Sequence, residues 1–316
     1  MARRTSASNG VRAIVEHRGY DEPNCMTYIQ GMELGVDDKA RMADFIPKDA
    51  KLIVDAGAGG GASARVVAQK FPSATVYAVD SHASMVKSMQ QAVADRVLPS
   101  NILVLAADAT REIPSLSGRA DAITASSFFH EPFSHEGWSS SHGRVVERPD
   151  LGKAALERAI RAGNKMLKKG GVYIVRDAYR PPSRQVILHL LTPEMNGKLG
   201  RFLSEFRADF GHKVSHSKTA PDAYRLDLVD CMEFLRKYHY DANWKHEMIE
   251  RHGYLEMSEL KKLFRKNGFK IVHSQPYNLA PLVEICLRHA RIDARLPPTH
   301  FLLVAEKTRE LPEKKG

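Results

Sequence analysis

The most constraining feature of the sequence is an alternation of apolar runs and helix-length segments between Lys51 and Asp177. The apolar runs are nearly continuous, which is typical of strands buried on both faces of a parallel sheet. Strands that alternate with helices at this spacing indicate a doubly wound α/β sheet. The pattern predicts strands at Lys51–Gly57, Thr75–Asp80, Asn101–Asp108, Ala120–Phe129 and Val172–Asp177, and helices at Ser63–Lys70, Ser84–Val97 and Leu151–Leu167.

The alternation stops after strand five, and two strands close the chain. We predict an N-terminal arm and helix (1–50), a core (51–180), a helical insertion that forms a substrate lid (181–268) and closing strands (269–316). Residues Thr27–Ile46 carry apolar residues at helical spacing. The insertion is predicted to hold helices at Arg184–Leu191, Lys198–Phe210, Ala223–Tyr238 and Ser258–Asn267, and the closing strands are Phe269–Tyr277 and His300–Lys307.

Composition excludes several classes of protein. The chain has 316 residues, of which 43% are hydrophobic and 27% charged, so it is neither disordered nor collagen-like. No apolar stretch approaches the roughly 20 residues of a membrane span. The cysteines lack disulfide-scaffold or zinc spacing, which predicts a reducing, cytoplasmic location and no metal site. We interpret the Arg-rich first twenty residues as a basic arm rather than a mitochondrial transit peptide.

The net charge of +10 suggests an anionic partner. The positive excess is spread over both halves of the chain rather than gathered in one patch. It therefore leaves a nucleic-acid partner open without requiring one.

A glycine-rich segment, Asp55-Ala-Gly-Ala-Gly-Gly-Gly61, follows the first predicted strand. Glycines there let the backbone turn tightly and approach a ligand, and a helix N-terminus behind them favours anions. The segment satisfies the dinucleotide pattern G-x-G-x-x-G/A and also the acidic-x-G-x-G-x-G pattern of S-adenosylmethionine enzymes. Asp55 favours the second, because a carboxylate repels a pyrophosphate but attracts an ammonium and a sulfonium.

Two further acids end predicted strands. Asp80 lies 21 residues beyond Gly59, where a carboxylate binds ribose hydroxyls in either cofactor class, and Asp108 ends the third strand. Ligands of open α/β sheets bind at the carboxyl edge of the strands. Strand-end aspartates also serve as helix N-caps, so this structural alternative stands beside the functional one.

The motifs DAGAGGG (55–61), VYAVD (76–80), AAD (106–108), DAITASSFFHE (121–131) and MLKKGGVYIVRD (166–177) occur in this order. Together they resemble the class I S-adenosylmethionine-dependent methyltransferases. The resemblance implies a Rossmann-like, seven-stranded sheet whose last strand is antiparallel, and a transferase that uses S-adenosyl-L-methionine. The cofactor contacts that it implies are Asp55, Gly57, Ala58, Gly59 and Gly61 for the methionine moiety, Asp80 and Ser81 for the ribose, Asp108 and Ala109 for the adenine, and Ser126.

The segment after the fourth strand reads Ser126-Ser-Phe-Phe-His-Glu-Pro-Phe133. It lacks the Asn/Asp-Pro-Pro-Tyr/Phe motif, which argues against adenine-N6 and cytosine-N4 methylases. It resembles the L-H-D/E stretch of small-molecule O-methyltransferases, which implies His130 as the catalytic base. Glu131 or Asp177 could orient the imidazole. His135 and His142, in the following Ser/His-rich loop, are expected to be solvated.

Strand five leaves the sheet as Arg176-Asp177-Ala-Tyr179-Arg180. All four charged or phenolic side chains are expected to face the substrate. Arg176, Tyr179 and Arg180 could bind a substrate carboxylate or phosphate, or the group could form a surface salt-bridge cluster. The favoured function is O-methylation of a small molecule. The alternatives are an RNA or nucleotide methyltransferase that uses the basic insertion, an NAD-dependent oxidoreductase, and a cofactor-binding protein without turnover. The oligomeric state stays open.

Overall fold

The computed structural model describes residues 35–141 and 144–311. The predicted basic arm, the first eight residues of the predicted helix Thr27–Ile46 and His142 lie outside these residues. What is described of that helix is a short α3 (Val36–Ala40) followed by a 3-10 turn, η1 (Arg41–Phe45). Pro47 follows directly, where a helix cannot continue.

The core is a seven-stranded sheet with the order β11-β13-β7-β4-β1-β2-β3. All neighbouring pairs from β7 to β3 are parallel, whereas β13 is antiparallel to both β7 and β11. The predicted mixed sheet with an antiparallel last strand is confirmed. Its strands are β1 (Leu52–Ala56), β2 (Thr75–Asp80), β3 (Ile102–Ala106), β4 (Ala120–Ser126), β7 (Leu167–Ala178), β11 (Phe269–Tyr277) and β13 (His300–Lys307).

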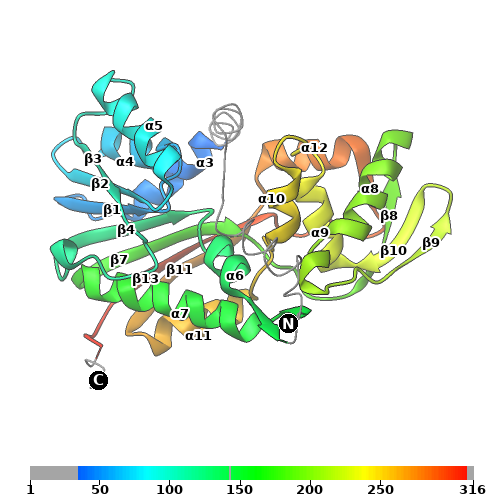
Figure 1. Ribbon diagram of the computed structural model, residues 1–316. Coiled ribbons are helices and arrows are strands. Elements are labelled where there is room, and N and C mark those ends of the chain that lie inside the picture. Colours follow the sequence, from blue (N-terminus) through cyan, green and yellow to red (C-terminus); the bar gives the residue numbers. More distant parts are fainter. Residues whose placement is uncertain (1–34, 142–143, 312–316) are drawn as a thin grey trace, which may run out of the picture.

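Helices cover both faces of this sheet (Figure 1). Strand β1 is buried at every position, which its apolar residues favour, and this burial includes the carboxylate of Asp55. One hydrophobic cluster packs α4 and α5 against the sheet, and another packs α7 and α11 against the opposite face. The four helices are α4 (Ala62–Lys70), α5 (Ala83–Ala94), α7 (Pro149–Met166) and α11 (Met257–Lys266). The short 3-10 turn η2 (Pro114–Leu116) precedes β4.

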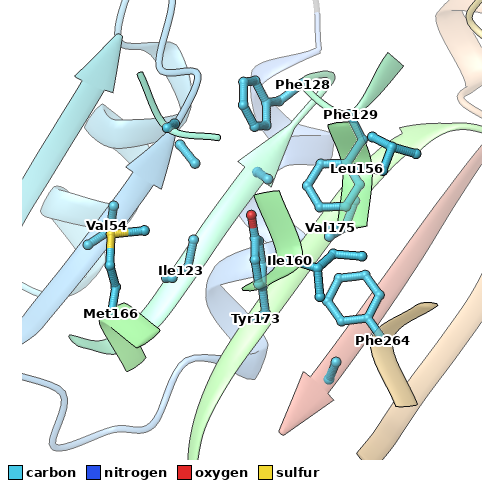
Figure 2. Packing of buried hydrophobic residues seen from close by; sticks show 14 of the residues in the cluster. Val54, Ile123, Phe128, Phe129, Leu156, Ile160, Met166, Tyr173, Val175 and Phe264 are labelled. Carbon is cyan, nitrogen blue, oxygen red and sulfur yellow. The ribbon is translucent and has the colours of Figure 1, made fainter. Parts of the chain in front are cut away.

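Aromatic packing fixes the segment that leaves β4 (Figure 2). The rings of Phe129 and Phe264 stack with centroids 6.1 Å apart, and Tyr173 meets both edge-on at 5.8 and 5.5 Å. All three rings are buried. Such contacts contribute about 0.5–1.5 kcal/mol each beyond the burial of area. They anchor the start of α6 (His130–Glu136) against β7 and α11.

The insertion holds helices, as predicted, but it is not helical throughout, because three strands occur among them. Its strands belong to a second sheet with the order β12-β8-β10-β9. Helices pack on this sheet through a hydrophobic cluster that is separate from those of the core (Figure 1). The predicted helix Arg184–Leu191 is β8 (Gln185–Leu190), and Ala223–Tyr238 divides into β10 (Ala223–Asp227) and α9 (Leu228–Lys237). The remaining elements are α8 (Pro193–Glu205), η3 (Ala208–Phe210), β9 (His216–Ala220) and α10 (Trp244–Ile249).

Elements from outside 181–268 also join this second unit. Helix α12 (Ala280–His289) and strand β12 (Ala290–Ile292) come from the closing segment, and β12 pairs with β8. Conversely, α11 packs on α7 and β11 of the core. A hairpin of β5 (Trp138–Ser141) and β6 (Arg144–Glu147) follows α6. Within the described ranges, the helices are too short or too polar to cross a membrane.

Candidate active site

The carboxyl ends of the parallel strands bring the predicted acids to one edge of the sheet. Asp55 pairs in register with Ala78 of β2 and Thr124 of β4, and Asp80 ends β2 beside Ala106. Ser126 at the end of β4 lies beside Arg176 of β7. The parallel topology alone therefore gathers Asp55, Asp80, Ser126 and Asp177 at the edge where such folds bind ligands.

The glycine loop is held by backbone hydrogen bonds to β2. The amides of Gly57 and Ala58 both donate to the carbonyl of Val79 at 3.0 Å. Gly57 has a φ of 68° and Gly61 a φ of 85°, conformations that side chains disfavour. A Cβ added at Gly57 would lie 2.3 Å from the Phe128 ring, so the loop and the segment after β4 touch at this point.

Gly57→Ala is accordingly expected to destabilise the protein by roughly 3 kcal/mol. The left-handed conformation costs a side chain about 1–2 kcal/mol, and the clash with Phe128 about 1–3 kcal/mol. Gly118→Ala is the matched control, because its φ is also positive, at 64°, but nothing lies within 4 Å of the added Cβ. Urea unfolding of both variants measures the difference, and equal losses would show that the contact with Phe128 is unimportant.

Asp55 is almost completely buried, with a relative exposure of 1%. Its Oδ1 accepts hydrogen bonds from the hydroxyls of Thr124 at 2.7 Å and Ser63 at 3.1 Å. Among the described residues, its Oδ2 has no hydrogen-bond partner, and burial raises the pKa of the carboxyl to about 6. An unpaired, desolvated carboxylate oxygen beside a glycine loop fits a cationic ligand group such as an ammonium.

Asp80 and Asp108 brace neighbouring turns. The two oxygens of Asp80 accept the amides of Gly59 and His82, each at 2.8 Å. Asp108 accepts the amide and the hydroxyl of Thr110 at 2.9 and 2.7 Å, and its side chain is 44% exposed. Each carboxylate keeps lone pairs for further donors such as ribose hydroxyls. Ala109 is buried, Ser81 is exposed, and the Ser126 hydroxyl oxygen is buried without a partner in the described chain.

His130 is the first residue of α6. Two of its atoms contact the carboxylate of Asp177, which lies near the end of β7. Its Nδ1 lies 2.9 Å from Asp177 Oδ1, and its backbone amide donates to Oδ2 at 3.2 Å. Asp177 is 1% exposed and also accepts the amide of Ala178. Of the two carboxylates considered from the sequence, Asp177 is therefore the one bonded to the ring, and Glu131 occupies the second position of α6. This pairing leaves Nε2 of His130 directed away from Asp177.

The Nε2 side of His130 faces residues that sequence reasoning missed. Glu250 Oε2 lies 3.6 Å from His130 Nε2, and the His252 ring meets the His130 ring edge-on with centroids 4.7 Å apart. His135 Nε2 lies 3.4 Å from Glu250 Oε1, and His135 is buried rather than solvated as predicted. Glu250 and His252 follow α10, about 120 residues beyond His130 in the sequence, so no local pattern could indicate them.

The charges in this cluster influence one another. Burial disfavours the charged form of His130, but Asp177 and Glu250 outweigh it and raise the imidazole pKa well above 6.5. Burial likewise opposes ionisation of Glu250, but the imidazoles of His130, His135 and His252, which lie 3.4–3.7 Å from its oxygens, hold its pKa well below 4.5. The cluster is thus a compact site of alternating imidazoles and carboxylates at the sheet edge.

The residues predicted to bind substrate form ion pairs and hydrogen bonds within the protein. Arg176 is 3% exposed, forms an ion pair with Asp38 of α3 and donates to the Ser127 hydroxyl at 3.1 Å. Arg180 donates to the carbonyl of Gly253 at 2.8 Å, and the carbonyl of Tyr179 accepts a hydrogen bond from Arg236. These contacts join α3 and the insertion to the edge of the sheet, next to His130.

Comparisons with known proteins agree with this geometry. A family model described as a methyltransferase domain matches residues 53–147. An O-methyltransferase family protein from Burkholderia thailandensis has 10% identity and a TM-score of 0.51, with 92% of this chain and 62% of that chain covered. A proposed O-methyltransferase from Nostoc punctiforme PCC 73102 has 15% identity and a TM-score of 0.51, with coverages of 96% and 69%. At these identities the two structures support the fold alone.

The search of curated proteins returned no match. The family model nevertheless covers the glycine loop, the first four core strands and His130. The buried, unpaired oxygen of Asp55 fits the cationic cofactor that this family uses. Residues 53–147 therefore match a methyltransferase domain, and the fold and glycine loop of the chain are those of class I S-adenosylmethionine-dependent methyltransferases.

Proposed function

We propose that the protein transfers a methyl group to an oxygen atom of a small-molecule acceptor at the His130–Asp177 end of the sheet. This proposal rests on two contacts of the Asp177 carboxylate, one with the ring of His130 and one with its backbone amide. A hydroxyl acceptor needs a group that removes its proton, whereas an amine acceptor needs mainly positioning. An imidazole oriented by a buried carboxylate is suited to the first task.

The cofactor is proposed to bind along the edge formed by β1, β2 and β3. The carboxylate of Asp55 would attract the ammonium of the methionine moiety, with the loop from Gly57 to Gly61 passing close to it. Asp80 and Ser81 would bind the ribose, and Asp108 and Ala109 the adenine. When bound, S-adenosylmethionine supplies a methyl group on a positively charged sulfur. The Phe128 ring lies against Gly57 of the loop, and His130 follows it two residues later in the chain.

His130 is proposed to act on the acceptor. In the neutral form of the ring, Nε2 takes the hydroxyl proton as the acceptor oxygen forms its bond to the methyl carbon, and the electron pair of the broken carbon–sulfur bond stays on sulfur. Because Asp177 and Glu250 raise the pKa of the imidazole, turnover is expected to increase with pH as the neutral form becomes populated. Asp177 stabilises the ring orientation and the charge that develops on it. Arg176 and Arg180 support this end of the site through α3 and Gly253.

A screen of hydroxylated small molecules with labelled methyl donor tests the proposal. Label is expected in an ether or ester product, and His130→Gln is expected to lower its formation about 100- to 10,000-fold with unchanged S-adenosylhomocysteine affinity. His216→Gln is the control, because His216 is an exposed residue of β9. Undiminished turnover of the His130 variant would leave that residue a structural role. Label found only in RNA or in nucleotides would contradict the proposed acceptor class.

A further inference from the structure

Three side chains at the end of the proposed acceptor site converge on one point. His130, Glu250 and His252 each offer a ligand atom, and these atoms all lie within 4.8 Å of one another. His130 comes from the core, whereas Glu250 and His252 come from the segment that follows α10. We infer that His130 Nε2, His252 Nε2 and a carboxylate oxygen of Glu250 form a binding site for one divalent transition-metal ion of the zinc type.

The dimensions of the cluster are close to those of a three-ligand metal site. Glu250 Oε2 lies 3.6 Å from His130 Nε2 and 3.7 Å from His252 Nε2. Metal–ligand bonds of about 2.0–2.2 Å in a tetrahedron place neighbouring ligand atoms roughly 3.3 Å apart. The two carboxylate–imidazole pairs therefore need to close by only a few tenths of an ångström around an ion, and the whole group of ligand atoms lies within 4.8 Å. Two imidazoles with one carboxylate, and a fourth position left to a further ligand, form a donor set used by catalytic zinc.

The surroundings of His130 are those of a metal-binding histidine. Its Nδ1 is bonded to Asp177 Oδ1 at 2.9 Å, and this bond leaves the Nε2 lone pair for an ion. The backbone of the segment that carries His252 is also fixed, because its amide donates to the buried carboxylate of Glu233 at 3.1 Å. Two of the three ligands are thus pre-positioned by carboxylates outside the site.

Negative charge around the three residues favours a dication. Glu247 Oε2 lies 3.3 Å from His252 Nε2 and, among the described residues, has no hydrogen-bond partner although it is buried. In the same described ranges, every ion pair of Glu250 is with an imidazole. An ion between these groups would lie beside the carboxylates of Glu250 and Glu247, of which Glu247 has Lys237 as a further partner at 3.8 Å.

The donor types indicate which ion to test. Imidazoles suit zinc and its neighbours in the first transition row, whereas magnesium and calcium prefer oxygen ligands. Methyl transfer requires no redox change, so Zn²⁺ is the natural probe. The inference rests on the proposed O-methyl transfer in one respect. An acceptor hydroxyl at the fourth position would lose its proton more readily, and His130 would then hold the ion instead of taking the proton itself.

Zinc titration of the chelator-treated full chain tests the site, by calorimetry and by elemental analysis after dialysis. We expect one tightly held Zn²⁺ per chain and much weaker binding of Mg²⁺. Glu250→Gln is expected to weaken zinc binding at least 100-fold, and Asp177→Asn, which acts through His130, 10- to 100-fold. His216→Gln removes an exposed histidine and is expected to bind zinc as the wild type does. Circular dichroism of each variant verifies that it is folded.

Absence of stoichiometric zinc, or wild-type affinity in both Glu250→Gln and Asp177→Asn, would overturn the site. Methyl transfer is assayed separately with and without the ion. Full O-methyl transfer by the metal-free protein would leave the proposed function standing and remove the role of the metal in it. Zinc bound at this site without methyl transfer to any hydroxyl would retain the metal site and contradict the proposed function.

Discussion

Replacing Asp55 with asparagine is expected to stabilise the protein by about 3 kcal/mol at pH 8 and to weaken S-adenosylhomocysteine binding roughly 100-fold. The stability gain follows from burial, which raises the pKa of this carboxyl from 3.8 to about 6, so that ionisation is costly in the folded state. Asparagine keeps an oxygen that can accept the hydroxyls of Thr124 and Ser63. It lacks the charge that an ammonium requires.

The pH dependence follows from the same shift. Because the folded state holds the Asp55 proton more tightly than the unfolded state, stability is lost as the pH rises from about 4 through about 6. The Asp55→Asn protein should lack this slope. Ligand affinity of the wild type should fall below pH 6, by about tenfold per pH unit, as the carboxylate becomes protonated.

Urea unfolding and calorimetry between pH 4.5 and pH 8 measure both quantities, over a range of about two units on either side of the midpoint. Asp95→Asn, at an exposed carboxylate, is the control and should change neither. A less stable Asp55→Asn protein at pH 8, or one with wild-type affinity, would contradict the assigned role of Asp55.

Replacing Lys237 with methionine is expected to cost about 3–5 kcal/mol of folding stability. The ammonium of Lys237 is fully buried, 3.3 Å from the buried carboxylate of Glu233, and donates to the carbonyls of Glu247 and Glu250 at 2.8 and 2.7 Å. Burial opposes the charge of Glu233, but Lys237 and nearby cations hold its pKa below the ordinary range. Removing Lys237 leaves that carboxylate without its partner.

The double variant Lys237→Met/Glu233→Gln separates charge from packing. It should recover part of the loss, because a neutral amide replaces the uncompensated carboxylate. Lys245→Met, at an exposed lysine of α10, should lie within about 0.5 kcal/mol of the wild type. Urea unfolding measures all three, and a loss below about 1 kcal/mol for Lys237→Met would show that the buried pair contributes little.

The centre of the core could be predicted because strands such as β1 and β4 are buried on both faces, which leaves a nearly continuous run of apolar residues. Strand β1 is the clearest case, with every residue buried. The insertion could not be predicted in the same way. Strand β8 alternates buried and more exposed positions, but its sequence holds a continuous Val-Ile-Leu run, and a short apolar run does not distinguish a strand from a helix. Asp227 also marks the boundary between β10 and α9, since its side chain caps the helix by accepting the amide of Val229.

The part of the site that lies on the core could be predicted, whereas the part contributed by the insertion could not. Asp55, Asp80 and Asp177 lie at the ends of parallel strands, so their common edge follows from topology. The orienting role of Asp177 was one of two alternatives, and the structure shows that it is bonded to His130. Glu250 and His252 reach His130 only because the insertion folds back onto the core. No spacing rule connects residues so distant in sequence.

Titration of the wild-type chain with S-adenosylhomocysteine and, in parallel, with NAD tests the account of the cofactor edge most directly. The two ligands share an adenosine, but one carries an ammonium and the other a pyrophosphate, so the unpaired oxygen of Asp55 discriminates between them. We expect saturable binding of one S-adenosylhomocysteine per chain and no measurable heat with NAD. Saturable binding of NAD without binding of S-adenosylhomocysteine would contradict the account.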